Sequence, residues 1–142
     1  MAFLIGDVKV VVNNVNLSAY ADSVDTPQSK DQIDVSTFNP TGARSFLPGL
    51  TDATISVEFL QNYGSNLVHQ TLYPLFTSGS QFPLYVVPDS DTATTATNPL
   101  FGGTAVLSSY NGLTGGLNDP AKFTAEFKPA PNAAFTWGTV AP

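Results

Sequence analysis

Side chains that commonly do chemistry are scarce in this sequence. Its 142 residues include no cysteine, which excludes disulfides, thiolate zinc sites, iron–sulfur clusters and thiol nucleophiles. The one histidine, His69, falls in a predicted helix with no aspartate or glutamate within four residues on either side. A nucleophilic triad needs a histidine base held by a carboxylate, and one histidine without cysteine is a poor donor set for a transition metal. We therefore interpret His69 as an ordinary helix-surface or interface residue.

Aspartates gather in two polar segments and are the strongest candidates for a cation site. Hard cations such as Ca²⁺ take several oxygen ligands, which clustered aspartates in loops can supply. However, the spacing matches no EF-hand loop, and aspartates in loops normally form turns. The residues are Asp22, Asp25, Asp31 and Asp34 in the first segment, and Asp89 and Asp91 in the second. No metal or other cofactor is expected.

The two glutamates, Glu58 and Glu126, fall on the polar faces of predicted strands. The distance between two carboxylates in space decides whether they can form a glycosidase pair, and solvated strand faces account for both residues. No glycine-rich loop has the pattern of a P-loop or of a dinucleotide-binding turn. The sequence therefore predicts no enzyme, and a small hydrolase that uses the aspartate clusters is the remaining catalytic alternative.

The charge balance narrows the class of protein further. Charged residues make up only 11% of the chain, with eleven acids against five bases, which gives a net charge of −6. So few bases cannot neutralise many phosphates, which argues against sequence reading or wrapping of DNA. Free monomers usually keep more surface charge for solubility, so part of the uncharged surface is expected to be covered by identical neighbours. A small acidic globular protein is the plainer alternative.

No segment of the sequence looks like a membrane or export signal. Nothing approaches the run of about 20 apolar residues that crosses a bilayer, so no membrane insertion is expected. The first ten residues, MAFLIGDVKV, lack a positively charged region followed by an apolar region and a cleavage site. An export signal is therefore not indicated.

Hydrophobic patterning predicts a mainly β, single domain over residues 1–142. The expected fold is an antiparallel β-sandwich or barrel with one flanking helix. Asn13-Asn14 is expected to form a two-residue hairpin turn, and Gly102-Gly103 to mark a bulge or a close backbone approach. Strands are expected at residues 8–12, 15–24, 53–60, 82–87, 100–110, 122–128 and 135–137.

The single helix is expected over LVHQTLYPLF, residues 67–76. Ser65 or Asn66 is a plausible N-cap, and residues 77–80 should end the helix. Pro74 should kink or stop it nearby because proline removes a backbone donor. A proline-rich segment, residues 129–142, closes the chain.

Periodicity disappears in residues 25–50, which we interpret as a long loop. The segment holds three prolines and two glycines, and loops of this length are usually functional or disordered. It is nevertheless too apolar for a merely solvated tether. Its apolar residues are Ile33, Val35, Phe38, Phe46, Leu47 and Leu50. The loop is therefore expected to pack on something outside its own subunit, and Pro48-Gly49 is expected to be a tight turn.

The stretch that begins at Arg44 resembles the major tail proteins, or tail tube proteins, of long-tailed bacteriophages, especially those of phages that infect actinobacteria. The pattern R-x-F-x-P-G-L-x-D-x-x-x-S is followed by an alternating strand and a short helix. Three further phrases agree: N-L-S-A-Y at residues 16–20, N-P-L-F-G-G-T-A-V at 98–106 and F-T-A-E-F at 123–127. The resemblance spans roughly residues 15–128 by element order.

This resemblance implies a structural protein that assembles with copies of itself. Two packed antiparallel sheets with a flanking helix would form the subunit, six copies would form a ring, and stacked rings would form the tube through which DNA leaves the particle. Other tail proteins, such as tape measure, terminator and distal tail proteins, would be partners, and DNA would pass without specific binding. The protein would belong to the virion and be assembled in the host cytoplasm. The alternative is a virion decoration or tail-surface binding module that does not polymerise.

The candidate interface residues lie in the long loop. Phe38, Phe46 and Leu47 would anchor it on a neighbour, and Arg44 would pair with a neighbour's carboxylate, since arginine is favoured at interfaces. Pro48, Gly49 and Leu50 complete the set. Glu58 and Glu126 are candidates to face the lumen, where acids would repel phosphate; an outer face is equally compatible with the sequence.

Overall fold

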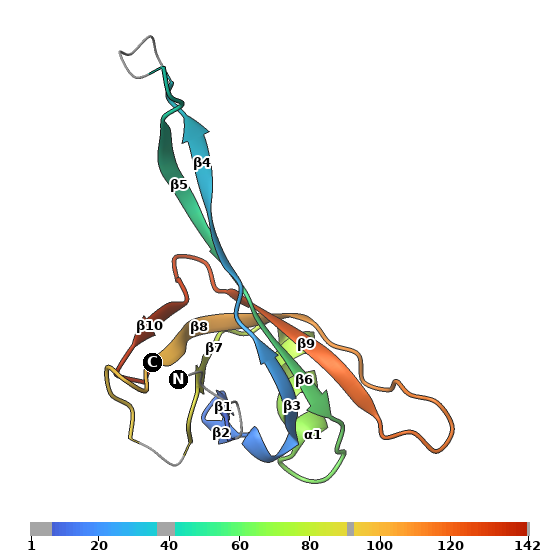
Figure 1. Cartoon of the computed structure of the whole chain (residues 1–142). Helices are drawn as coiled ribbons and strands as arrows, with labels where there is room; N and C mark the ends of the chain where they lie inside the picture. The colour runs from blue at the N-terminus through green and yellow to red at the C-terminus, as the bar shows by residue number, and fades with distance from the viewer. Residues whose placement is uncertain (1–6, 37–41, 91–92, 142) are drawn as a thin grey trace.

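A computed structural model describes residues 7–36, 42–90 and 93–141, and the structural statements below refer to these residues (Figure 1). The chain is mainly antiparallel β with a single long helix, as predicted. The elements are β1 (Lys9–Val12), β2 (Val15–Asn16), a 3₁₀ turn (Ser18–Tyr20), β3 (Ala21–Asp25), β4 (Gln28–Asp34), β5 (Phe46–Ala53), β6 (Ile55–Leu60), α1 (Val68–Ser78), β7 (Phe82–Val87), β8 (Leu100–Ser109), β9 (Lys122–Pro129) and β10 (Thr136–Gly138).

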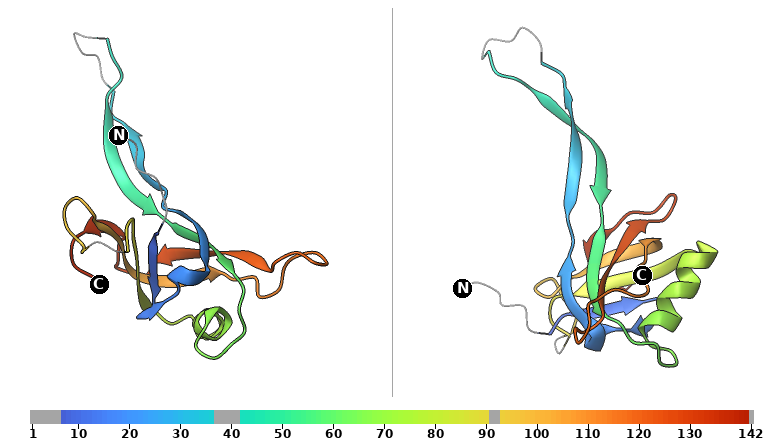
Figure 2. Two further views of the ribbon diagram at one scale, coloured as in Figure 1. Left: turned by 60° about the horizontal axis from the view of Figure 1, so that its bottom comes forward. Right: turned by 90° about the vertical axis from the view of Figure 1, so that its right-hand side faces the viewer.

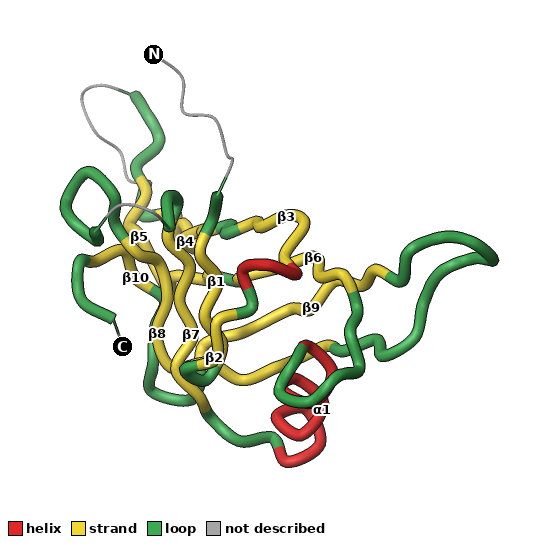
Figure 3. The backbone as a smooth tube through the Cα atoms, turned by 90° about the horizontal axis from the view of Figure 1, so that it is seen from below, coloured by secondary structure: helices red, strands yellow, loops and turns green. Residues whose placement is uncertain are grey.

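The body of the molecule is one antiparallel sheet with the strand order β2-β1-β7-β8-β9-β6-β3. β8 pairs with β7 along its first half and with β9 along its second half, so this one strand joins two halves of the sheet. β10 pairs with residues 100–102 at the start of β8, a part of β8 that β9 does not reach. The halves curl toward each other around the core (Figure 3). Among the described strands no ladder joins the outer strands β2 and β3, so the sheet is not shown as a closed barrel.

A single core fills the space between the two halves and the helix. Alternating residues of β6 and β9 point inward, where Phe59 and Phe123 meet with ring centroids 5.7 Å apart. Phe82 from the other half packs edge-on against Phe127. The helix adds its three buried residues, among them Leu72, to the same cluster. Burying these apolar side chains stabilises the body by about 25 cal/mol for each Å² of apolar surface removed from water.

The first hairpin forms where the sequence predicts it. Asn13 and Asn14 have φ values of 50° and 65°, the left-handed conformation that a two-residue turn requires and that asparagine tolerates. The prediction of one strand over residues 15–24 is wrong, because the 3₁₀ turn interrupts it. Ser18 is the physical reason: its Oγ accepts the N–H of Val10 at 2.8 Å, and its own N–H donates to Asn16 Oδ1. Side-chain bonds of this kind compete with strand pairing.

The helix begins slightly later and runs longer than predicted. Leu67 occupies the N-cap position and no side chain caps the helix, so the expected caps Ser65 and Asn66 are wrong. Pro74 does not stop the helix, which continues to Ser78. Its apolar face is buried against the sheet on both sides of the proline, and this packing outweighs one lost backbone bond. Gly79 ends the helix in the left-handed conformation (φ 66°), as expected for a C-terminal cap.

The long loop predicted for residues 25–50 is instead a two-stranded hairpin, β4 with β5, which we call the arm (residues 28–53). The arm rises away from the body in Figure 1 and in both views of Figure 2. Hydrophobic alternation failed to reveal it because neither face of β4 packs on the body, and all seven of its residues are exposed. Without a buried face, strand sequences need not alternate.

No helix among the described residues is long and apolar enough to span a membrane.

Candidate inter-subunit interface

The arm continues a ribbon that starts in the body. β3 runs into β4 and β5 runs into β6, so the pairing of β3 with β6 extends outward as the pairing of β4 with β5. The N–H of Thr54 donates to the carbonyl of Pro27 at 3.2 Å where the two ladders meet. Pairing reaches the far end, where the N–H of Val35 donates to the carbonyl of Ser45. At about 3.3 Å per residue, the eleven residues 25–35 span about 33 Å, slightly more than the ten residues of β8.

A β-bulge lies halfway along the arm. Lys30 pairs with Thr51 but Gln32 pairs with Pro48, so β5 carries one extra residue at this point. Pro48-Gly49 is therefore part of a bulged strand, and the prediction of a tight turn is wrong. A Cβ on Gly49 would lie only 3.0 Å from the Cβ of Asp31, which explains why the smallest residue fits there.

The bulge gathers apolar side chains on one face of the arm. Ile33 and Leu47 are directly opposite each other and so share a face. The extra residue shifts the alternation, so that Leu50 joins this same face although it is three positions from Leu47. The side chains are 53%, 54% and 80% exposed, respectively. Phe46, 49% exposed, lies on the opposite face. An isolated two-stranded hairpin is marginally stable at best, so this apolar surface is suited to a partner.

The outer end of the arm carries the chain's one arginine. Arg44 is exposed in the segment that returns to β5. Close by, the N–H of Ser36 donates to Asp34 Oδ1 at 2.9 Å and the N–H of Ser45 donates to Ser36 Oγ at 2.8 Å. The hydrogen bonds from Ser36 hold the pKa of Asp34 below its ordinary value. Phe38, the remaining predicted anchor, lies outside the described residues.

A polar face covers the outer side of β3, β6 and β9. Glu58 and Glu126 share it, because Ser56 pairs with Glu126 and the inward positions of both strands are apolar. Lys128 contacts Glu126 at 3.3 Å. Lys122 contacts Asp22 at 3.3 Å. The pKa of Asp22 lies below its ordinary value. The largest cause is the side-chain hydrogen bond with Glu58, followed by the hydrogen bond and the positive charge of Lys122.

The end of the body farthest from the arm carries an aromatic cluster that the sequence did not reveal. His69 Nδ1 lies 2.6 Å from the Tyr110 hydroxyl, which also accepts a hydrogen bond from Gln61. Burial raises the pKa of Tyr110. Tyr73 stacks on His69, with ring centroids 5.2 Å apart. His69 thus links α1 to Tyr110, the residue that follows β8, in addition to the predicted place on the helix surface.

The loop between β8 and β9 projects from the body (Figure 3). It presents Leu113 and Leu117, which are 81% and 93% exposed. Two leucines in a glycine-rich turn region were the sequence signal for this surface.

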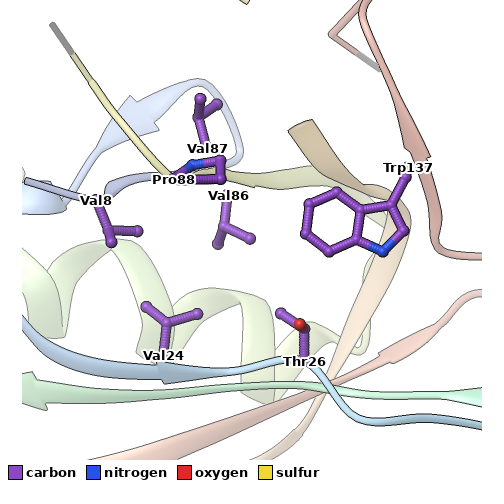
Figure 4. Close-up of a pocket in the computed structure, with 7 residues that line it drawn as sticks. All are labelled: Val8, Val24, Thr26, Val86, Val87, Pro88 and Trp137. Carbon is purple, nitrogen blue, oxygen red and sulfur yellow. The ribbon is translucent and has the colours of Figure 1, made fainter. Parts of the chain in front are cut away.

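An apolar groove of about 210 Å³ lies beside the base of the arm (Figure 4). Figure 4 shows Trp137 at one side of it, facing Val86, Val24 and Thr26. Trp137 is 49% exposed and is the only tryptophan of the chain. Sequence reasoning assigned no role to this residue. The available signal was a lone tryptophan beside Phe135 in a tail otherwise rich in proline and alanine.

The aspartate segments form no metal site in the part of the chain that is described. No group of three or more histidine, cysteine, aspartate or glutamate residues gathers there, and Asp91 lies outside this part.

Comparison with solved structures identifies known proteins that share this fold. No family model and no curated protein matches the sequence. The fold is similar to a chain from the virion of a native gene transfer agent particle, with a TM-score of 0.75, 16% identity, and coverage of 96% of this chain and 98% of that one. It is also similar to a chain from the tail of an empty gene transfer agent particle, refined with helical and C6 symmetry (TM-score 0.69, 15% identity, coverage 92% and 93%).

A third match is the tail tube of SPP1, with a TM-score of 0.69, 12% identity, and coverage of 96% of this chain and 78% of that chain. The predicted fold class is confirmed: the chain has the fold of phage tail tube proteins, and the resemblance noted at Arg44–Ser56 is supported by the structural matches.

Proposed function

We propose that this protein is a structural subunit that assembles with copies of itself into stacked hexameric rings forming a phage tail tube. The observation that carries the proposal is the arm: a paired, mostly exposed hairpin whose apolar side chains Ile33, Leu47 and Leu50 stay at least half exposed within the subunit. Such a surface is stabilised when a neighbouring copy covers it. The C6-symmetric tail among the structural matches supports six copies per ring.

The geometry suits contacts that propagate along a tube. The arm leaves the body where β6 begins, near Ile55, whereas the leucine-bearing loop leaves at the other end of the same strands, near Lys122. A surface at one end that binds a surface at the other end makes a heterologous contact, which repeats without limit unless it closes. Stacking of rings therefore follows if the arm reaches the next ring, with Phe46, Leu47 and Leu50 covered and Arg44 paired with a carboxylate there.

The polar face of β3, β6 and β9 is proposed to line the lumen. It carries Glu58 and Glu126 and opposes the helix, which packs on the inner side of the sheet. Acids on a lumen wall repel phosphate, so DNA passes without binding. By the same proposal the protein resides in the virion, is assembled in the host cytoplasm, and meets tape measure, terminator and distal tail proteins at the ends of the tube.

The direct test replaces the arm with a short turn. Residues 29–52 are replaced by Asn-Gly. This change keeps Gln28 paired with Ala53, the pair of the arm nearest the body, and closes the hairpin with a favoured two-residue turn. We expect the full chain to form tubes or hexameric rings in negative-stain microscopy of concentrated protein. The shortened chain should show the circular dichroism of the body and remain monomeric.

Tubes formed by the shortened chain would contradict the role of the arm. A full chain that stays monomeric or trimeric at high concentration would contradict the tube and favour the decoration module.

A further inference from the structure

The arm joins the body through a narrow hinge. The ladder of the body ends at the pair Asp25 with Ser56, and the ladder of the arm begins at Gln28 with Ala53. Between them lie Thr26-Pro27 on one strand and Thr54 on the other, in two separately defined sheets. Proline lacks the N–H needed for a continuous ladder. One backbone bond, from the Thr54 N–H to the Pro27 carbonyl at 3.2 Å, crosses this gap in the ladder, so the backbone restrains the angle between arm and body less than a continuous ladder would.

Two side chains from the C-terminal part of the molecule reach the two strands of this hinge. Trp137 Nε1 donates to Gln28 Oε1 at 3.1 Å, across 109 positions of sequence. Lys128 Nζ donates to Thr54 Oγ1 at 3.0 Å. One bond therefore holds the first residue of β4, and the other holds the junction of β5 and β6.

Trp137 is itself held firmly in place. β10 pairs with β8 so that Trp137 is opposite Phe101, and the two ring centroids are 4.9 Å apart. Phe135, 2% exposed, packs edge-on against the same Phe101 ring. A Cβ on Gly103 would lie 2.5 Å from the carbonyl oxygen of Ala134, so this glycine allows the C-terminal segment to lie flat on β8. A side chain anchored in this way can direct what it binds.

We propose that the C-terminal part of the molecule positions the arm: Trp137, seated on Phe101, fixes the direction of β4 through Gln28, and Lys128 in β9 is the second support at Thr54. This inference rests on the proposed function for its consequence, since stacking needs every arm to point the same way. An arm that samples many directions must be ordered at each contact, which weakens association. Gln28 and Trp137 are positioning residues, and the proline-rich tail has a structural task.

The first experiment measures the arm's direction in the full-length monomer. Because the chain has no cysteine, Ser45→Cys on the arm and Ser109→Cys on the body carry spin labels at two chosen places. Both sites are exposed.

The test variants change the hydrogen bond at Gln28. Gln28→Met removes the acceptor and keeps the side-chain length, whereas Gln28→Glu keeps an acceptor oxygen. Gln32→Met is the matched control, because Gln32 lies on the same face of β4 but is farther from the hinge.

We expect pulsed electron resonance to give one narrow distance distribution for the parent, Gln32→Met and Gln28→Glu proteins. Gln28→Met should clearly broaden the distance distribution, and so should Trp137→Phe, which keeps an aromatic side chain but removes the N–H donor. Thermal melting of Gln28→Met should stay unchanged. Equal widths in all variants would overturn the proposal. Broadening in Gln32→Met as great as in Gln28→Met would also overturn it, because the effect would then not come from the hinge.

The second experiment separates this inference from the proposed function. The critical concentration for assembly should rise about 2- to 10-fold in Gln28→Met, the range carried by one net hydrogen bond, and not in Gln32→Met. A parent chain that never assembles would contradict the proposed function, while the monomer distances would still decide the positioning role. Changed assembly with unchanged distances would overturn the positioning role alone.

Discussion

A glycine in β8 allows the backbones of β8 and β7 to approach each other closely. At Gly102, a Cβ would collide with the carbonyl oxygen of Leu84 and come within 2.7 Å of the Tyr85 Cα. Both obstacles are backbone atoms of the paired strand β7, so no side chain can rotate away. The expectation of a close backbone approach at Gly102-Gly103 is confirmed, and its physical cause is steric rather than a need for positive φ.

At the scale of one residue, Gly102→Ala should destabilise the monomer. We expect the free energy of unfolding in urea to fall by about 1–3 kcal/mol, the usual cost of forcing extra atoms into a packed site. Gly138→Ala in β10 is the control, because a Cβ there meets nothing within 4 Å. Equal losses in the two variants would show that steric crowding at β7 is not the cause.

The arm is the element on which assembly depends in this proposal. Its bulge brings Leu50 to the face of Leu47 and Ile33, and this arrangement makes an apolar stripe from a sequence that lacks regular alternation. Body strands such as β6 stabilise the subunit by burying alternate side chains, whereas most side chains of β4 and β5 are exposed and so accessible to a neighbouring subunit.

At the scale of the element, Leu50→Ser should affect assembly and leave the monomer's stability nearly unchanged. The side chain is 80% exposed, so the free energy of unfolding should change by no more than about 0.5 kcal/mol. Tube formation, followed by light scattering, should require clearly higher protein concentration. Val140→Ser is the matched control, since Val140 is 81% exposed but off the arm. Assembly that responds equally to both changes would argue against a specific arm contact.

The whole molecule has two contrasting sides. The outer face of β3, β6 and β9 is polar, with four acids, Asp22, Asp25, Glu58 and Glu126, and two lysines, Lys122 and Lys128. The helix packs on the opposite, inner side of the sheet. A ring with the polar face inward places the helix toward the outside of the tube.

At the scale of the assembly, single cysteines report which side faces the lumen. Thr124→Cys lies between the two glutamates on the polar face, and Ser78→Cys lies at the end of the helix; both positions are exposed. After labelling with biotin maleimide, streptavidin should capture tubes labelled at residue 78 and not intact tubes labelled at residue 124. Capture at residue 124 would place the polar face outside and contradict the lumen assignment.

Local patterns determined much of the body. The alternation of Ile55, Val57 and Phe59 predicted β6, the run from Phe82 predicted β7 to the residue, and asparagine's tolerance of positive φ predicted the first turn. These features depend on neighbours a few positions apart, so the sequence carries them openly.

The tertiary structure alone decided the rest, because it depends on pairs far apart in the chain. The arm forms by pairing residues around Ile33 with residues around Leu47, without a buried face to impose a pattern. Its support comes from Trp137, 109 positions away from Gln28. The sequence therefore predicted that this apolar segment would need a partner, and only the folded chain showed that the segment is a paired arm with Trp137 bonded at its base.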